Sequence, residues 1–157
     1  MAPQWATAIV AACILAPQFV VAAIAPWIGR TAQRAGRRPL LVLCFVPLCL
    51  RSAVFAITSD PSVIVMAQLL DGVSAAVLGV LVPLVIADTT RGTGHFNLAQ
   101  GVVGAAVGTG ASLGTTIAGY VADMSGDAVA FLFLGSVGAM GLTLVLALMP
   151  ETRQAPA

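Results

Sequence analysis

The sequence contains no lysine, a single histidine and few charges of either sign. Its seven basic residues are all arginine, six residues are acidic, and charged residues make up 8% of the 157-residue chain. A soluble domain carries about 25% charged residues, so this chain has too little polar surface to face water on all sides. The net charge of +1 gives no reason to expect a nucleic-acid partner.

The sequence also has few residues suited to metal binding or catalysis. The three cysteines, Cys13, Cys44 and Cys49, lie in apolar runs and show no disulfide or zinc spacing. The only histidine, His95, lies in a polar segment with no cysteine or serine at a catalytic spacing. We therefore expect free thiols, a solvated histidine, no metal ion, no cofactor and no enzymatic activity.

Long apolar runs occupy most of the chain. A run of about 18 or more such residues predicts a transmembrane helix, because ~20 residues rising ~1.5 Å each cross a hydrocarbon core of ~30 Å. The sequence predicts an all-α fold, a polytopic transmembrane helix bundle that forms a single membrane domain over residues 1–157. Its five predicted spans lie at approximately residues 5–29, 39–58, 62–87, 97–121 and 128–149.

The arginines predict the orientation of this bundle. The positive-inside rule assigns the arginine-rich side to the cytoplasm, which puts the N-terminus outside and the C-terminus inside. An outside N-terminus directly before a span suggests that at least one helix precedes it, so we expect a fragment of a longer protein. If the spans alternate, the cytoplasmic side carries Arg30, Arg34, Arg37, Arg38, Arg91 and Arg153, and the other side only Asp60, Asp123 and Asp127.

Two charged side chains fall inside predicted spans, where charge is costly and usually lies within a bundle. Counted from a turn predicted at residues 59–61, Arg51 lies roughly 10 Å deep and Asp71 roughly 14 Å deep. Consecutive antiparallel helices would bring them together as an ion pair, with Gln68 one turn before Asp71 on the same face. Two interpretations stay open: a structural ion pair, or a carboxylate that binds a proton or faces a substrate.

Small residues recur at helical spacing in the fourth span. Gly104 and Gly108 lie on one row, and Gly110 and Gly114 lie on a second. Such rows let helices approach closely in a bilayer, so we predict tight packing on these faces, with sliding against neighbouring helices as the alternative. The fifth span repeats the pattern more sparsely with Gly135, Gly138 and Gly141.

The segment between the first two spans carries four arginines in the pattern Gly-x-x-x-Gln-Arg-x-Gly-Arg-Arg. This pattern resembles motif A of the major facilitator superfamily, Gly-x-x-x-Asp-Arg-x-Gly-Arg-Arg, which follows the second and eighth helices of these twelve-helix transporters. Gln33 stands where the family has aspartate, so the charge interaction of that position does not carry over. The matching residues are Gly29, Arg34, Gly36, Arg37 and Arg38.

Other stretches support the same resemblance. Residues 69–75 with Pro83, Asp88 and Arg91 resemble the tenth helix of bacterial members and its cytoplasmic exit. Residues 150–152 resemble the Pro-Glu-Thr that often follows the last helix of a half. The resemblance thus maps the chain onto helices eight to twelve, which is part of a six-helix half.

An alternative register maps the chain onto helices two to six. That register requires an arginine at the position of Gln68. It also requires a proline after Gly114, where the sequence has Thr115. A replaced aspartate in motif A is, in addition, commoner in the second copy of the motif, so we prefer the second half.

The resemblance implies secondary transport by alternating access, in which two six-helix bundles move about a site at the midplane. Many bacterial relatives export drugs or other small organic molecules, and proton coupling is common. The resemblance also implies a cytoplasmic gate. There, Arg34, Arg37 and Arg38 would bind carboxylates or helix C-termini in one conformation and release them in another, with Asp88 as a partner.

The expected partners follow from this resemblance. They are the lipid bilayer of a bacterial cell membrane, a small-molecule substrate, and the N-terminal half of the transporter or another membrane subunit. The five helices would supply only half of one cavity wall, so we expect no transport by this chain alone. Two alternatives stay open: a small non-transport membrane protein that acts as a helper or an anchor, and a small transporter that works as a homodimer.

Overall fold

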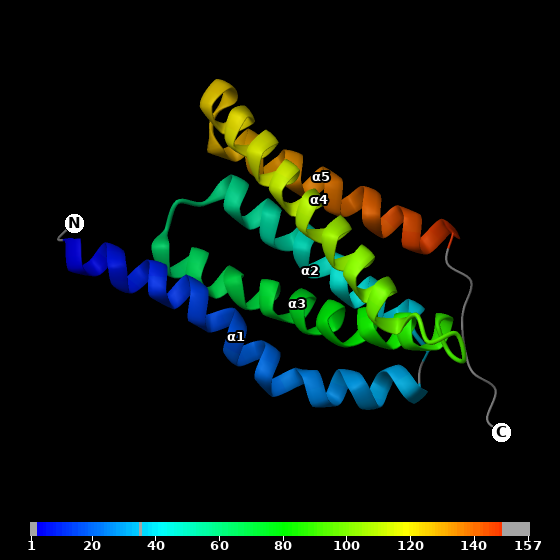
Figure 1. The fold of residues 1–157 in the computed structure, drawn as a ribbon. Coiled ribbons are helices and arrows are strands. Elements are labelled where there is room, and N and C mark those ends of the chain that lie inside the picture. Colours follow the sequence, from blue (N-terminus) through cyan, green and yellow to red (C-terminus); the bar gives the residue numbers. More distant parts are fainter. Residues whose placement is uncertain (1–2, 35, 149–157) are drawn as a thin grey trace.

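A computed structural model describes residues 3–34 and 36–148 of the chain. Within these ranges there are five helices and no strand, and each helix is long and apolar enough to cross a membrane. The predicted all-α bundle with five spans is therefore confirmed. The Pro-Glu-Thr stretch at residues 150–152, Arg153 and the last residue of the fifth predicted span lie outside the described residues. The helices are α1 (Pro3–Arg34), α2 (Arg38–Ile57), α3 (Pro61–Thr89), α4 (Phe96–Ser125) and α5 (Asp127–Leu148) (Figure 1).

Glycine and proline residues set the ends of several helices. α2 begins shortly after Gly36, whose φ of 85° is rarely adopted by residues with a side chain. Gly126, with a φ of 90°, separates α4 from α5. At the start of α3, Asp60 Oδ1 accepts a hydrogen bond of 2.8 Å from the backbone N–H two residues later, and Pro61 takes the first helical position. The predicted turn between the second and third spans is confirmed.

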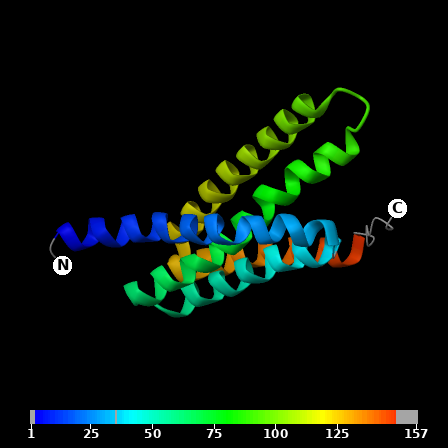
Figure 2. The same ribbon diagram turned by 90° about the horizontal axis from the view of Figure 1, so that it is seen from below.

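α3 lies at the centre of the arrangement, in contact with both α1 and α2, and α2 packs along α5. α4 packs mainly against α5 and only slightly against α3. Figure 2 shows α4 and the adjoining part of α3 diverging from the other helices. The buried core therefore forms between α1, α2 and α3, and its largest fully buried side chains are Ile28, Cys44, Val77 and Leu81.

Glycines determine how closely two helix pairs approach. A Cβ added to Gly72 of α3 would lie 2.6 Å from the backbone oxygen of Pro17 in α1, so only glycine fits at this crossing. On α5, three glycines spaced three residues apart face α2, which lets these two helices pack closely over about two turns. The facing pairs are Gly135 with Ser52, Gly138 with Cys49 and Gly141 with Phe45.

The glycines of the fourth span depart from the packing prediction. A Cβ added to Gly104, Gly108, Gly110 or Gly114 would meet no heavy atom within 4 Å. Within the described part of the chain these glycines make no close contact with another helix, because α4 touches the bundle through other positions such as the buried Ala118. The rows of small residues form a surface that another helix could approach closely, but the sequence does not specify which helix that is.

Candidate functional site

The motif A-like segment folds back against the end of α3. The left-handed turn at Gly36, which is itself buried, brings Arg37 to the start of α2, and the Arg37 guanidinium forms an ion pair with Asp88. Arg91 approaches the other oxygen of Asp88 at 3.6 Å. The side chains of Arg37 and Asp88 are 19% and 25% exposed, which limits screening of this pair compared with Arg91 at 80%.

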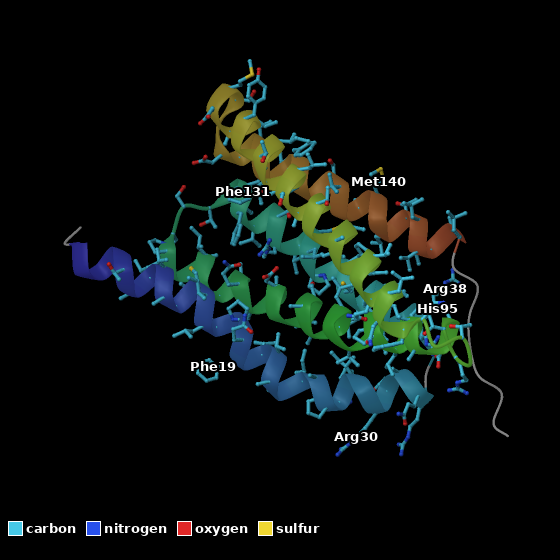
Figure 3. All side chains as sticks on the ribbon, in the orientation of Figure 1. Phe19, Arg30, Arg38, His95, Phe131 and Met140 are labelled. Atoms are coloured by element: carbon cyan, nitrogen blue, oxygen red, sulfur yellow. The ribbon has the colours of Figure 1, made fainter. Side chains whose placement is uncertain are left out.

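The neighbouring Arg38 binds a different helix. Its Nη2 donates a 2.7 Å hydrogen bond to the backbone carbonyl of Leu146, in the last turn of α5. Helix C-termini carry unsatisfied carbonyls and a partial negative charge, so a guanidinium there is stabilising. Together, Arg37 and Arg38 connect the α1–α2 segment to the ends of both α3 and α5, at the end of the bundle where Figure 3 also shows His95.

The other motif-like residues do not join these contacts. Arg34 and Gln33 are exposed, and neither has a hydrogen-bond or charge partner among the residues described. Gly29 lies on α1 with Val80 of α3 nearest, 3.9 Å from the position of an added Cβ. Of the predicted gate set, the structure thus brings together Arg37 and Asp88, places Arg38 on a helix terminus, and leaves Arg34 on the surface.

A second polar cluster lies inside the bundle, towards the opposite end of α2. Arg51 Nη1 lies 2.9 Å from Asp71 Oδ1 and donates a 3.0 Å hydrogen bond to Gln68 Oε1. The guanidinium also lies over the ring of Phe55, 5.4 Å from its centroid, and Phe55 packs edge-on against Phe131 of α5. Antiparallel packing at equal depth therefore does bring the two charges together across α2 and α3. Arg51 Nε is buried without a hydrogen-bond partner in the described structure.

One interhelical contact had no signal in the sequence. Ser74 Oγ donates a 2.7 Å hydrogen bond to the Cys44 carbonyl, and Cys44 Sγ lies 3.7 Å from the Ser74 carbonyl as a weak donor. Both side chains are buried in the α2–α3 interface. This reciprocal pair fixes the same register that aligns Arg51 with Asp71, because both contacts join α2 to α3.

A cavity of about 300 Å³ opens between α3 and α4. Its wall is apolar except for Gln100, whose Oε1 is buried and has no hydrogen-bond partner among the described residues. The space exists because the two helices barely touch and because Gly79 and Gly104 contribute no side chain. Sequence reasoning missed Gln100, since a single amide at the start of an apolar helix does not indicate a cavity.

No group of three or more histidine, cysteine or acidic residues in the described part of the chain could hold a metal ion. His95 is exposed at the N-terminal end of α4 and makes no side-chain cap hydrogen bond there. The chemistry that the described side chains offer is therefore ion pairing and hydrogen bonding between helices.

Five membrane-length helices, with an arginine-rich connection tied to two helix ends, define a multi-pass membrane protein. The chain belongs to the Major Facilitator Superfamily, whose match covers residues 3–157. An uncharacterized MFS-type transporter of Mycobacterium tuberculosis (strain CDC 1551 / Oshkosh) is 39% identical over 93% of the chain, which corresponds to 35% of that relative.

Two further relatives carry names that refer to drug resistance. The class B tetracycline resistance protein of Escherichia coli is 34% identical over 64% of the chain and 25% of its own length. Multidrug resistance protein 2 of Bacillus subtilis (strain 168) is 27% identical over 81% of the chain and 31% of its own length. The chain thus spans about a third or less of the length of the relatives that it matches.

Proposed function

We propose that the chain forms helices eight to twelve of a twelve-helix secondary transporter in a bacterial cell membrane. The family match, the short share of each relative that the chain covers, and the position of the motif A-like segment after the first helix support this placement. The arginine-bearing end then faces the cytoplasm. Transport itself requires the N-terminal bundle, because the substrate cavity of this fold forms between two bundles.

The observation that carries this proposal is the double attachment of the α1–α2 connection. Arg37 binds Asp88 at the end of α3, and Arg38 binds the Leu146 carbonyl at the end of α5. The Arg37–Asp88 pair is mostly buried and contributes about 1.5–3 kcal/mol. The Arg38 bond is exposed, and solvent screening lowers its contribution. Both contacts lie within this bundle, so they would act in a gate by holding the ends of its helices together in one conformation and releasing them in another.

We also propose small organic molecules as substrates, with export as the direction. Two relatives are named for resistance to tetracycline or to multiple drugs. The α3–α4 cavity is lined by apolar side chains and by Gln100, whose Oε1 is buried without a partner in the described chain, so a ligand would reach it only if the Gln100 side chain turned towards the cavity. Such a site suits an apolar molecule that carries a hydrogen-bond donor, because a buried acceptor without a donor is costly.

Asp71 is the proposed site of proton coupling. Its carboxylate forms an ion pair with Arg51, and Arg51 also donates a hydrogen bond to Gln68. Protonation of Asp71 would remove the charge that attracts Arg51 and would loosen the α2–α3 contact. If Asp71 serves only folding, Asp71→Asn will lower the amount of folded protein in proportion to any lost transport.

The open face of α4 is the proposed contact surface for the second bundle. Gly108 leaves this face without side-chain bulk, and a Cβ added there would meet no heavy atom within 4 Å. Gly104, one turn earlier, lines the α3–α4 cavity. The same face suits the competing role of a helper or an anchor that binds partner helices. The DNA upstream distinguishes the two: an in-frame coding region for about seven further helices supports the transporter, and an intergenic promoter supports the small protein.

The direct test uses the complete protein in proteoliposomes with an imposed pH gradient, assayed with tetracycline and a lipophilic cationic dye. The parent protein should move at least one of them, and Arg37→Gln with Arg38→Gln should change the rate by about tenfold or more, the factor that corresponds to ~1.4 kcal/mol. Arg91→Gln is the matched control, because Arg91 is largely exposed and should have a much smaller effect. Unchanged transport in the double variant would rule out the gate.

A further inference from the structure

The outer side of α1 near its arginine-bearing end carries an unusual set of side chains. Trp27, Arg30 and Arg34 follow at intervals of three and four residues, so they share one face of the helix. Trp27 is 55% exposed, and both arginines are exposed. Ile28, on the other side of the helix, is fully buried against α3. We call Trp27, Arg30 and Arg34 the α1 outer face, and Figure 3 shows Arg30 pointing away from the bundle.

The two arginines of the α1 outer face lack counter-charges. Arg37 and Arg91 share Asp88, and Arg38 binds a carbonyl, but Arg30 and Arg34 have no partner among the described residues. α1 itself contains no acidic residue. The two guanidiniums lie one helical turn apart, so together they can bind an anion from outside the described chain.

Apolar side chains continue the α1 outer face towards the middle of the helix. Phe19 is 73% exposed and, at eleven residues before Arg30, lies on almost the same line of the helix surface. Figure 3 shows both on the outer side of α1. Along this line an apolar ring comes first, then an indole, then two guanidiniums. A phospholipid has the same order: acyl chain, interface and phosphate.

We propose that the α1 outer face binds an anionic phospholipid. The guanidiniums of Arg30 and Arg34 donate hydrogen bonds to the phosphodiester, for which the planar arginine fork is well suited. The indole of Trp27 lies at the boundary between headgroup and acyl chain, and Phe19 contacts the acyl chain. A free phosphate would use only the arginines, whereas the aligned exposed rings favour a lipid. The inference does not depend on whether the protein transports anything.

The test uses Trp27 as a reporter in vesicles. The chain has two tryptophans, so Trp5→Phe leaves Trp27 as the sole one. The parent for the test is the Trp5→Phe chain in phosphatidylcholine vesicles that contain either brominated phosphatidylglycerol or brominated phosphatidylcholine in equal amount. Each arginine near an anionic surface enriches such lipid about fivefold, so quenching by the brominated phosphatidylglycerol should be clearly stronger.

Three variants identify the groups responsible. Arg30→Gln with Arg34→Gln should make quenching by the two lipids equal. Arg30→Lys with Arg34→Lys keeps both charges but removes the planar fork, so it should keep only part of the preference. Arg91→Gln should keep the preference, since Arg91 lies in the α3–α4 connection and is not part of the α1 outer face.

Other results would overturn the proposal. Equal quenching in the Trp5→Phe chain would show that no anionic lipid gathers at Trp27. An equal loss in Arg91→Gln would show a general surface-charge effect rather than a site. Loss of the preference on adding inorganic phosphate would show an anion site that does not select lipid. Absence of quenching by either lipid in the complete protein would show that protein, not lipid, covers the face.

Discussion

Arg51 of α2 and Asp71 of α3 form an ion pair across their interface, with 2.9 Å between Nη1 and Oδ1. Both residues lie within helices long enough to cross a membrane, where an unpaired charge is costly. Gln68 accepts a further hydrogen bond from the same Nη1, and Phe55 lies under the guanidinium. The pair therefore connects the second and third helices at a depth where few other polar contacts occur.

Replacing only one residue of this pair should lower the stability of the bundle more than replacing both. Arg51→Gln or Asp71→Asn alone leaves one charge unpaired in a span, and we expect each to lower stability by about 1–3 kcal/mol. The double variant should recover at least half of the larger loss. Thermal unfolding in detergent measures all three. Additive losses in the double variant would contradict an energetic coupling between Arg51 and Asp71.

Gly72 and Gly104 form a matched pair for testing helix contacts. Gly72→Ala places a Cβ against the backbone of α1 and should destabilise the chain by about 1–3 kcal/mol, because neither backbone can give way. Gly104→Ala meets no atom within 4 Å and should leave the unfolding temperature of this chain unchanged or slightly higher. A larger loss in Gly104→Ala than in Gly72→Ala would contradict the packing described here.

If α4 contacts the second bundle, a substitution on its open face has a different effect in the complete protein. There Gly108→Ala should lower transport or stability, although a Cβ at this position meets no heavy atom within 4 Å in the described chain. If transport and stability of the complete protein do not change in this variant, the small-residue face of α4 does not contact the second bundle.

Gln100 provides a test of the α3–α4 cavity. Its Oε1 is buried without a donor, so Gln100→Leu should raise stability slightly, or leave it unchanged, by removing an unsatisfied acceptor. In the complete protein the same change should lower the affinity for substrates that carry a hydrogen-bond donor by about fivefold or more. The affinity for substrates without a donor should not change. A transport assay with a matched pair of such substrates measures this difference. Equal effects on both substrates would exclude a contact with the amide.

Local composition was enough to predict the helices and one of the polar clusters. Hydropathy over about 20 residues depends only on neighbouring residues, so the five spans could be predicted directly. The Arg51–Asp71 contact could also be anticipated, because a short turn forces consecutive helices to run antiparallel and equal depth then follows from counting. Both arguments need no knowledge of how distant helices pack.

Contacts between distant helices could not be predicted in the same way. Glycine rows look alike in α4 and α5, yet only the α5 glycines meet a neighbour. The bond from Arg38 to Leu146 joins residues 108 positions apart, and its acceptor is a backbone carbonyl that any residue would supply. Such contacts depend on which helix faces which, and neither hydropathy nor residue spacing specifies that. The Arg37–Asp88 pair was expected only because of the resemblance to motif A.

The Arg37–Asp88 pair is the proposed cytoplasmic gate contact, and a charge exchange between these two residues in the complete protein is the decisive test of that role. Arg37→Asp and Asp88→Arg should each reduce the initial rate of proton-driven transport in proteoliposomes, because each places like charges together. The combined exchange should restore at least half of the parent rate. If the combined exchange transports no better than either single variant, or if the single variants transport normally, the gate assigned to this pair is contradicted.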